Sequence, residues 1–230
     1  MTPHNVARPA AAGALCVAIT SAGAGAAFAQ TAATTTPSDP TAQAAAQKPR
    51  ITVRQRRLDV RSGARTAVSG AVAPGAAGLT VALEVRRRHG WKAIDRDRTD
   101  AAGGYTLRER LRRTGSARAR VRVAPAPGVL SAERRLGRLN VYRYTSASWY
   151  GPGLYGNRTG CGGTLSVGRL GVAHKSLPCG TMVTLRHGGR SVRVPVIDRG
   201  PYVGGREYDL TAATAQRLGF HGHGALLTTR

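Results

Sequence analysis

The chain has 230 residues, of which 30 are glycine and 12 are proline, and only 5% are aromatic. Because a single hydrophobic core usually serves about 100 to 150 residues, this length predicts two small domains. The composition, with no long helical period of apolar residues, excludes a helical bundle and favours short strands joined by turns. The net charge of +24 favours polyanionic surroundings, which leaves nucleic acid, an anionic membrane surface and an anionic wall polymer open. The base composition of the genome alone would equally explain a bias to arginine over lysine together with so much alanine and glycine.

Residues 1–29 have the pattern of a secretory signal peptide. An apolar run of small residues from Ala10 to Phe28 follows a segment with one cation, and Ala27-Phe28-Ala29 provides a cleavage site. Polar residues and glycines interrupt the run, so it does not predict a membrane anchor. Cys16 lacks the small preceding residue of a lipoprotein signal, and cleavage would remove it. We therefore expect an exported protein with no transmembrane anchor after cleavage, which argues against nucleic acid as its partner.

Cys161 and Cys179 are the cysteines that remain after this cleavage. An even number of cysteines in an oxidising compartment predicts a disulfide bond, which would stabilise the fold by about 3 kcal/mol. Neither cysteine belongs to a C-x-x-C motif or has the paired histidine spacing of a zinc site. We expect no metal and no cofactor.

Residues 30–50 contain almost no large apolar side chain, so they predict a disordered linker. From Ile51 onward the pattern changes to alternation with a period of two, which is typical of strands. The apolar positions on one face of two such strands are Val81, Leu83 and Val85, and then Ala117, Ala119, Val121 and Val123. The pattern predicts a small β-sandwich over residues 51–124, immunoglobulin-like in its strand spacing, and a second linker over residues 125–145. We interpret this domain as a spacer or a wall-binding module, with Trp91 and Tyr105 in its core.

Residues 146–230 form the second predicted domain. A β-hairpin is expected where alternating residues flank the turn at His187-Gly188-Gly189, and a short helix is expected from Ala212 to Leu218, ending at Gly219. The domain also carries four short motifs in order: Ala147-Ser148-Trp149-Tyr150-Gly151; Ala173-His174 with Leu177-Pro178-Cys179-Gly180-Thr181; Asp198-Arg199-Gly200-Pro201-Tyr202; and Asp209-Leu210-Thr211-Ala212-Ala213.

In this order the four motifs resemble the rare lipoprotein A family of double-psi β-barrels, which is related in fold to barwin and the expansins. The resemblance covers Ser146 to about Leu227. It implies an all-β chain whose second domain is a closed six-stranded barrel with a polysaccharide groove. It also implies lytic transglycosylase activity on the glycan strands of peptidoglycan. The cysteine pair is similar to that of a disulfide-bearing secreted branch of the family.

Cleavage of a glycosidic bond requires a proton donor to the leaving oxygen, usually a carboxylic acid. The carboxylates of the second domain are Asp198, Glu207 and Asp209. Asp209 matches an aspartate of the family and is our first choice for the general acid and base. As an alternative, it would cap the following helix, which would lower its pKa. Asp198 matches a second family aspartate, and its alternative role is to organise a loop beside Arg199.

The resemblance adds His174 to Asp209 and Asp198 as a catalytic residue that hydrogen-bonds the acid or a sugar hydroxyl. Aromatic rings suit stacking on sugars, with core packing as the competing use. The expected substrate-binding residues are Trp149, Tyr150, Thr159, Arg199 and Tyr202.

Gly163 and Ser166 occupy positions where the transglycosylase members of the family carry acidic residues. This departure leaves two hypotheses for the domain. The first is a lytic transglycosylase, and the second is a non-lytic, expansin-like module that loosens or binds the wall. Both predict glycan strands of peptidoglycan as the partner and exclude nucleic acid. The sequence leaves open whether anionic wall polymers also bind.

Overall fold

The computed structural model describes residues 45–230. The predicted signal peptide and the linker up to residue 44 lie outside this range. Strands dominate the described residues, and α1 (Ala212–Leu218) is a short helix. In this part of the chain no helix has the length and apolar character needed to span a membrane.

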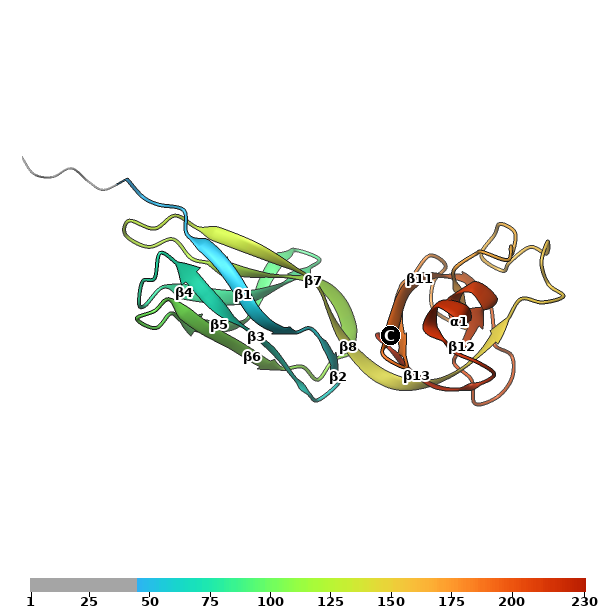
Figure 1. Ribbon diagram of the computed structural model, residues 1–230. Helices are drawn as coiled ribbons and strands as arrows, with labels where there is room; N and C mark the ends of the chain where they lie inside the picture. Colours follow the sequence, from blue (N-terminus) through green and yellow to red (C-terminus); the bar gives the residue numbers. More distant parts are fainter. Residues whose placement is uncertain (1–44) are drawn as a thin grey trace, which may run out of the picture. The chain divides into compact units, whose positions relative to one another are not determined.

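Two sheets build the first domain (Figure 1). The three-stranded sheet consists, in spatial order, of β1 (Arg50–Arg57), β3 (Arg65–Ala73) and β6 (Gly104–Arg110). The other sheet runs β5 (Gly90–Arg98), β4 (Thr80–Arg87), β7 (Gly115–Val123) and the first part of β8 (Ala132–Tyr150), with β2 (Asp59–Arg61) pairing beside β8. Their inner faces share one hydrophobic core, to which Val68, Leu107, Val81 and Val121 contribute fully buried side chains.

The alternation seen in the sequence matches this core. Val81, Leu83 and Val85 are buried, whereas Arg118 between two inward-facing alanines is exposed. Tyr105 is buried as expected, and its hydroxyl donates to the Thr52 carbonyl oxygen. The expectation for Trp91 was wrong, because this residue is half-buried and lies outside the core cluster. The immunoglobulin-like relationship of the domain stays a prediction.

The predicted linker over residues 125–145 is largely strand. β8 begins at Ala132 and pairs with β7 through Val141, and it buries Leu136 and Leu139. The apolar residues of this stretch are separated by arginines and interrupted by a bulge, which hides the alternation. From Arg143 the same strand pairs with β13 (Gly224–Thr228), so β8 belongs to both domains.

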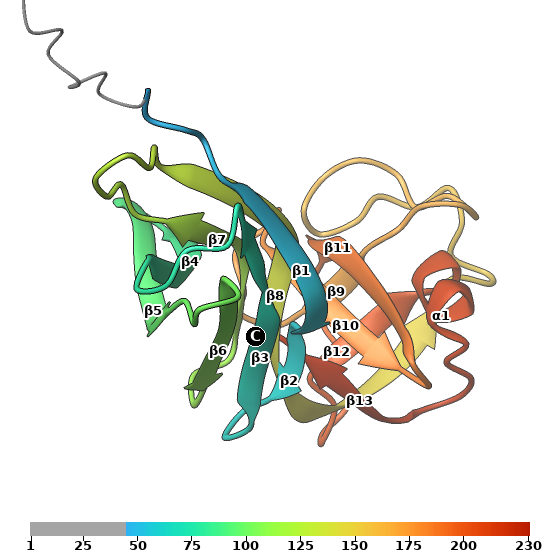
Figure 2. The ribbon, with the colours of Figure 1, turned by 60° about the vertical axis from the view of Figure 1, so that its left-hand side comes forward.

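Six strands close the barrel of the second domain (Figure 2). In order around the ring they are the end of β8, β12 (Tyr208–Thr211), β9 (Val172–His174), β11 (Arg190–Asp198), β10 (Met182–His187) and β13, which returns to β8. The interior is filled by buried side chains that include Val183, Leu185, Val194 and Leu210. The closed ring, the β10–β11 hairpin and helix α1 confirm the prediction for this domain.

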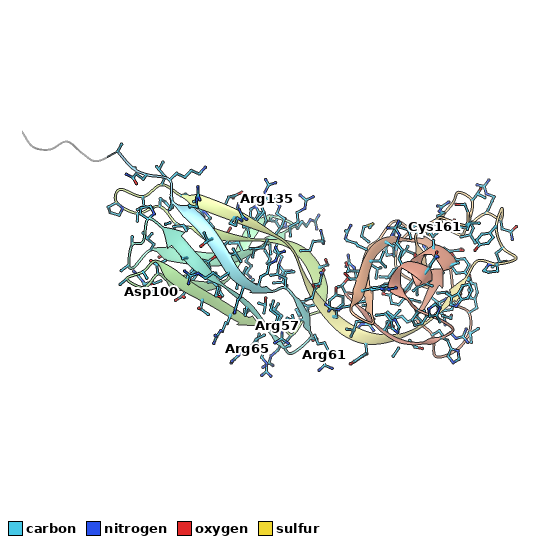
Figure 3. The ribbon with its side chains drawn as sticks, in the orientation of Figure 1. Arg57, Arg61, Arg65, Asp100, Arg135 and Cys161 are labelled. Carbon is cyan, nitrogen blue, oxygen red and sulfur yellow. A yellow bond between two sulfur atoms is a disulfide. The ribbon has the colours of Figure 1, made fainter. Side chains whose placement is uncertain are left out.

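Cys161 and Cys179 are joined by a disulfide bond, with their Cα atoms 5.5 Å apart. Cys161, labelled in Figure 3, lies in the long loop between β8 and β9, and Cys179 lies just before β10. The bond therefore ties the long loop to the wall of the barrel.

Candidate active site

Four residues form one row across four neighbouring strands of the barrel. Asp209 of β12 lies opposite Ser148 of β8 on one side and opposite Ala173 of β9 on the other. Ala173 in turn lies opposite Asp198 of β11. Directly paired residues point to the same face of a sheet, and the next residues along, Val172 and Leu210, belong to the core. The row therefore faces away from the core, with its two carboxylates about two strand spacings, roughly 10 Å, apart.

Asp209 is half-buried, and its two carboxylate oxygens have different surroundings. Ser148 Oγ donates a hydrogen bond to Oδ1 over 2.8 Å. Among the described residues Oδ2 accepts no hydrogen bond, and it is not sealed from solvent. Burial raises the pKa of Asp209, and the negative charge of Asp198 adds to this effect, while Ser148 and Arg206 oppose it. The Asp209 carboxyl thus has an elevated pKa, and Ser148 holds it through Oδ1 only.

Asp198 accepts hydrogen bonds on both of its oxygens. The backbone N–H groups of Gly160 and Arg199 donate to Oδ1 over 2.7 and 2.8 Å, and the Tyr150 hydroxyl donates to Oδ2 over 3.1 Å. Gly160 belongs to the long loop after β8, so Asp198 fastens this loop to the barrel. This contact pattern favours the loop-organising role over proton donation.

Tyr150 lies two residues after Ser148 on β8, and its hydroxyl contacts Asp198. Burial raises the pKa of Tyr150, and the negative charges of Asp198 and Asp209 raise it further. The phenol therefore remains a neutral hydrogen-bond donor to Asp198.

The alternative role of Asp209 as a helix cap is wrong. Helix α1 begins after Thr211, and the hydroxyl of Thr211 accepts from the Thr214 backbone N–H. Asp209 lies two residues earlier, within β12, where its backbone pairs with two strands. Since Thr211 supplies the cap, the carboxylate of Asp209 is free for another use.

His174 does not join Asp209, contrary to the expectation that it supports the acid. It lies opposite Tyr208 in the β9–β12 ladder, one residue from the Ala173–Asp209 pair, so its ring points to the other face. His174 Nδ1 accepts hydrogen bonds from the backbone N–H groups of Ser176 and Leu177, which places the ring proton of the neutral imidazole on Nε2. Burial lowers the pKa of His174, an effect that the carboxylate of Glu207 partly opposes.

Glu207 is the partner that the structure gives to His174, although the Nε2–Oε1 distance of 3.7 Å is longer than a hydrogen bond. Arg143 forms a two-pronged ion pair with Glu207, with one N–O distance of 2.8 Å, and the Thr145 hydroxyl donates to it over 2.6 Å. Burial raises the pKa of Glu207, but the contacts with Arg143 and Thr145 outweigh this and hold it below its usual value. Glu207 is therefore ionised and structural, which removes it as a proton donor.

Residues 143–227 match the protein family described as lytic transglycolase. The probable endolytic peptidoglycan transglycosylase RlpA of Synechocystis is 46% identical over 80 residues, which are 34% of this chain and 25% of that protein. The endolytic peptidoglycan transglycosylase RlpA of Campylobacter jejuni is 45% identical over 74 residues, or 31% of this chain and 27% of that protein. The second domain is an RlpA-like double-psi β-barrel. The chain spans only about a quarter to a third of the length of these relatives.

The aromatic residues expected to bind sugar in the RlpA-like barrel do not form one platform. Trp149 and Tyr150 are adjacent on β8, so their side chains point to opposite faces. Trp149 is 40% exposed and lines a cavity of about 340 Å³, together with Tyr155, Phe220 and residues of helix α1. Tyr202 is 84% exposed. Sugar stacking by Trp149 or Tyr202 stays a prediction.

Thr159 and Arg199 are engaged within the protein. The Thr159 hydroxyl donates to the Gly162 carbonyl oxygen over 2.8 Å, and this side chain is buried. Arg199 donates to the carbonyl oxygens of His174 and Leu177 and to the sulfur of Cys179. These contacts stabilise the loops around the row and leave both residues with little capacity for a sugar.

The two departures from the family pattern lie in the loop after β8. Gly163 has φ +79°, and a side chain there would meet the guanidinium of Arg169 at 2.7 Å from its Cβ. Arg169 donates to the carbonyl oxygens of Thr164 and Gly162, and Ser166 is exposed. An arginine thus occupies the space beside a position where family members carry an acid.

Sequence reasoning missed Ser148 and the Arg143–Glu207 pair. Ser148 is part of the first motif, but nothing in the motif shows that its hydroxyl meets a carboxylate 61 residues later. Arg143 lies before the motif and 64 residues from its partner. Among the described residues no group of three or more His, Cys, Asp or Glu side chains is arranged to hold a metal ion.

Proposed function

We propose that the RlpA-like barrel cleaves the glycan strands of peptidoglycan as a lytic transglycosylase, with Asp209 as its general acid and base. The observation that carries this proposal is the state of Asp209: a half-buried carboxyl with a raised pKa, which Ser148 holds through one oxygen, while the other oxygen accepts no hydrogen bond from the described residues. The similar proteins named endolytic peptidoglycan transglycosylases support the choice of substrate.

In the proposed reaction, protonated Asp209 transfers its proton to the oxygen that links two sugars. The bond between this oxygen and the anomeric carbon breaks, and positive charge develops on the sugar ring. A hydroxyl of the same sugar attacks the anomeric carbon and gives its proton to the Asp209 carboxylate. The acid is thereby restored, no water is consumed, and the product ends in an anhydro sugar.

Asp198 and Tyr150 act as positioning residues in this scheme. The charge of Asp198 contributes to the raised pKa of Asp209, and Tyr150 holds Asp198 in place. Because Asp198 also accepts a hydrogen bond from the Gly160 backbone N–H, it sets the position of the long loop after β8. Their loss should weaken catalysis by a smaller factor than the loss of Asp209.

A second candidate function is a non-lytic module that binds or loosens the wall. The observation that favours it is the replacement of two family acids by Gly163 and Ser166, with the cation Arg169 beside the first of them. A barrel without these two carboxylates retains the shape to bind a glycan but has less means to stabilise positive charge on the sugar.

We further propose that the protein is exported and acts in the periplasm or the cell wall. The signal-peptide pattern of residues 1–29 supports this location, as does the disulfide bond between Cys161 and Cys179.

The deciding experiment is mass spectrometry of purified peptidoglycan after incubation with the protein. Anhydro-muropeptides in the wild-type reaction, and a yield at least about 100-fold lower with Asp209→Asn, are the expected result. Sedimentation of the protein with the wall in the absence of any product would instead assign the barrel to the non-lytic class. Ser166→Asp serves as the companion variant, because it restores a family acid and should increase the yield of anhydro products if charge stabilisation limits the rate.

A further inference from the structure

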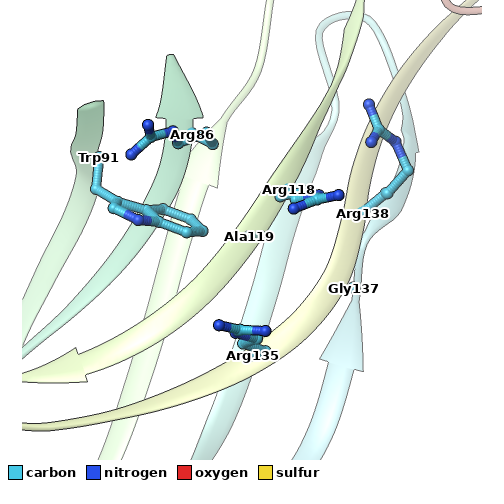
Figure 4. A pocket seen from close by; sticks show the side chains of 7 residues that line it. All are labelled: Arg86, Trp91, Arg118, Ala119, Arg135, Gly137 and Arg138. Carbon is cyan, nitrogen blue, oxygen red and sulfur yellow. The ribbon is translucent and has the colours of Figure 1, made fainter. Parts of the chain in front are cut away.

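The outer face of the sheet β5-β4-β7-β8 carries a cavity of about 700 Å³ that is unrelated to the barrel row. Figure 4 shows the indole of Trp91 on β5 and four arginine side chains from β4, β7 and β8 around this space. The four arginines are Arg86, Arg118, Arg135 and Arg138. None of the described residues that line the cavity is acidic.

The sheet register explains how these charges come together: three of the arginines share one row, and Arg135 lies opposite Arg120 in the adjacent row. Arg86 lies directly opposite Trp91, and Arg118 lies directly opposite Arg138. Strands β4 and β7 are neighbours, with Val85 opposite Ala119, so the two pairs adjoin in one row. Like charges in directly opposed positions of a sheet are destabilising. The row therefore carries an electrostatic cost that a bound anion would remove.

The acids on this face are paired elsewhere. Glu84 and Glu133 contact Arg120, which lies in the next row, and the Nε–Oε2 distance to Glu84 is 2.7 Å. Among the described residues no carboxylate lies within 4 Å of a guanidinium nitrogen of Arg86, Arg118, Arg135 or Arg138. The cavity thus has a local excess of positive charge that the protein does not neutralise.

Two of the lining groups are held in position. Ser116 accepts a hydrogen bond from Arg138 Nε through its hydroxyl over 2.8 Å and another from Nη2 through its carbonyl oxygen over 3.0 Å. The guanidinium of Arg120 stacks on the Trp91 ring at 4.2 Å from its centroid, so the indole is fixed while it lines the cavity. Fixed guanidinium groups bind the oxygens of phosphate with well-defined geometry, and an indole face suits a sugar ring.

We propose that this cavity binds a phosphate-bearing glycopolymer, with phosphate oxygens on Arg118, Arg135 and Arg138 and a sugar ring on Trp91. A single indole among four guanidinium groups fits a polymer that carries many phosphate groups and few sugar rings. Single-stranded nucleic acid is favoured less, because it is bound through aromatic rings that stack on successive bases. The sandwich would then attach the protein to an anionic polymer independently of any reaction in the barrel.

Equilibrium binding to glycosylated poly(glycerol phosphate) tests the proposal. The site variant is Arg118→Gln with Arg135→Gln, both exposed and without a described side-chain partner. The matched control is Arg54→Gln with Arg65→Gln, which removes the same charge from exposed positions on β1 and β3 of the other sheet. We expect affinity to fall about tenfold or more in the site variant and less than about threefold in the control.

Two further binding measurements identify which part of the polymer is recognised. Trp91→Leu should lower affinity for the glycosylated polymer more than for the same polymer without sugars, and neutral dextran should not bind to the wild-type protein. Equal losses in the site variant and the control would overturn the proposal, because binding would then be diffuse. So would tighter binding of single-stranded DNA through the same arginines, or no binding of the polymer at all.

The folding of the variants is checked by thermal melting without ligand. The site variant should melt at or above the temperature of the wild type, since it removes repulsion. If it melts lower, Arg86→Gln provides the same comparison from a different strand. Asp209→Asn should bind the polymer as the wild type does, so a failure of the proposed enzymatic function leaves this test intact.

Discussion

Replacement of Asp209 by Asn separates the chemical role of the carboxyl from its structural role. Asn retains an oxygen that can accept from Ser148 Oγ, now 2.8 Å from Oδ1, but it cannot donate a catalytic proton. General acid catalysis contributes about 10²- to 10⁴-fold to a rate, so the release of anhydro-muropeptides should fall by about that factor.

The Asp209→Asn protein should be as stable as the wild type or more stable, although its activity falls. Burial raises the pKa of Asp209 in the folded protein, so the ionised side chain opposes folding above that pKa, and this cost disappears as the pH falls below the unfolded value. The neutral Asn carries no such cost, and the midpoint of thermal unfolding at neutral pH should be equal to or higher than that of the wild type.

The assay follows soluble anhydro-muropeptides by mass spectrometry over time, with thermal melting of the same samples. Ser191→Ala, at an exposed position on β11 outside the row, is the control for a surface change in the same domain. Undiminished cleavage by the Asp209→Asn protein would remove Asp209 from the mechanism and refute the reasoning from its raised pKa. Asp198 would then be the next carboxylate to test.

Three other outcomes are expected. Ser148→Ala removes a hydrogen bond that lowers the pKa of Asp209, so the loss of activity with rising pH should move to higher pH, whereas an unchanged pH profile would contradict a link between Ser148 and the acid. Glu207→Gln should destabilise the protein by about 1 to 2 kcal/mol at neutral pH; because the folded pKa of Glu207 is lowered, its stabilisation is present above the unfolded pKa and is lost as the pH falls through the folded one. The difference from the wild type in denaturant melts should therefore vanish in acid, and a difference that persists there would contradict this assignment. The mature protein should have an intact mass about 2 Da below its reduced form, because Cys161 and Cys179 are bridged, and two thiols that react with an alkylating reagent before reduction would exclude the bond.

The sequence predicts the barrel well because its signals are local. Helix α1 and the β10–β11 hairpin each depend on residues a few positions apart, with Gly219 ending the helix at φ +63°. The motifs carry the rest, since their order matches a known fold. The strand β8 was missed for the opposite reason: its apolar positions are separated by arginines, and its pairing partners lie elsewhere in the chain.

The candidate site likewise combines features with a local sequence signal and features that depend on strand pairing. The sequence identifies Asp209 and Asp198 as candidates, but their separation across Ala173 depends on pairing between three strands. His174 was assigned to the wrong neighbour because adjacent positions on a strand point to opposite faces, which a motif read as a string of letters does not convey. Trp91 shows that an aromatic residue in a strand can be as well placed for a ligand as for a core.

The course of β8 also decides where this chain can be divided. A fragment that starts at residue 146 would lose the pairing of Arg143 with Thr228 and of Thr145 with Leu226, and with them the partner of Glu207. A fragment that ends at residue 124 would leave β7 without the strand that covers it through Val141. The pairings of β8 divide between Tyr142 and Arg143, so a cut at that point, within a continuous strand, keeps the backbone ladders of both halves. The boundary between the two domains is therefore a point within one strand and not a linker.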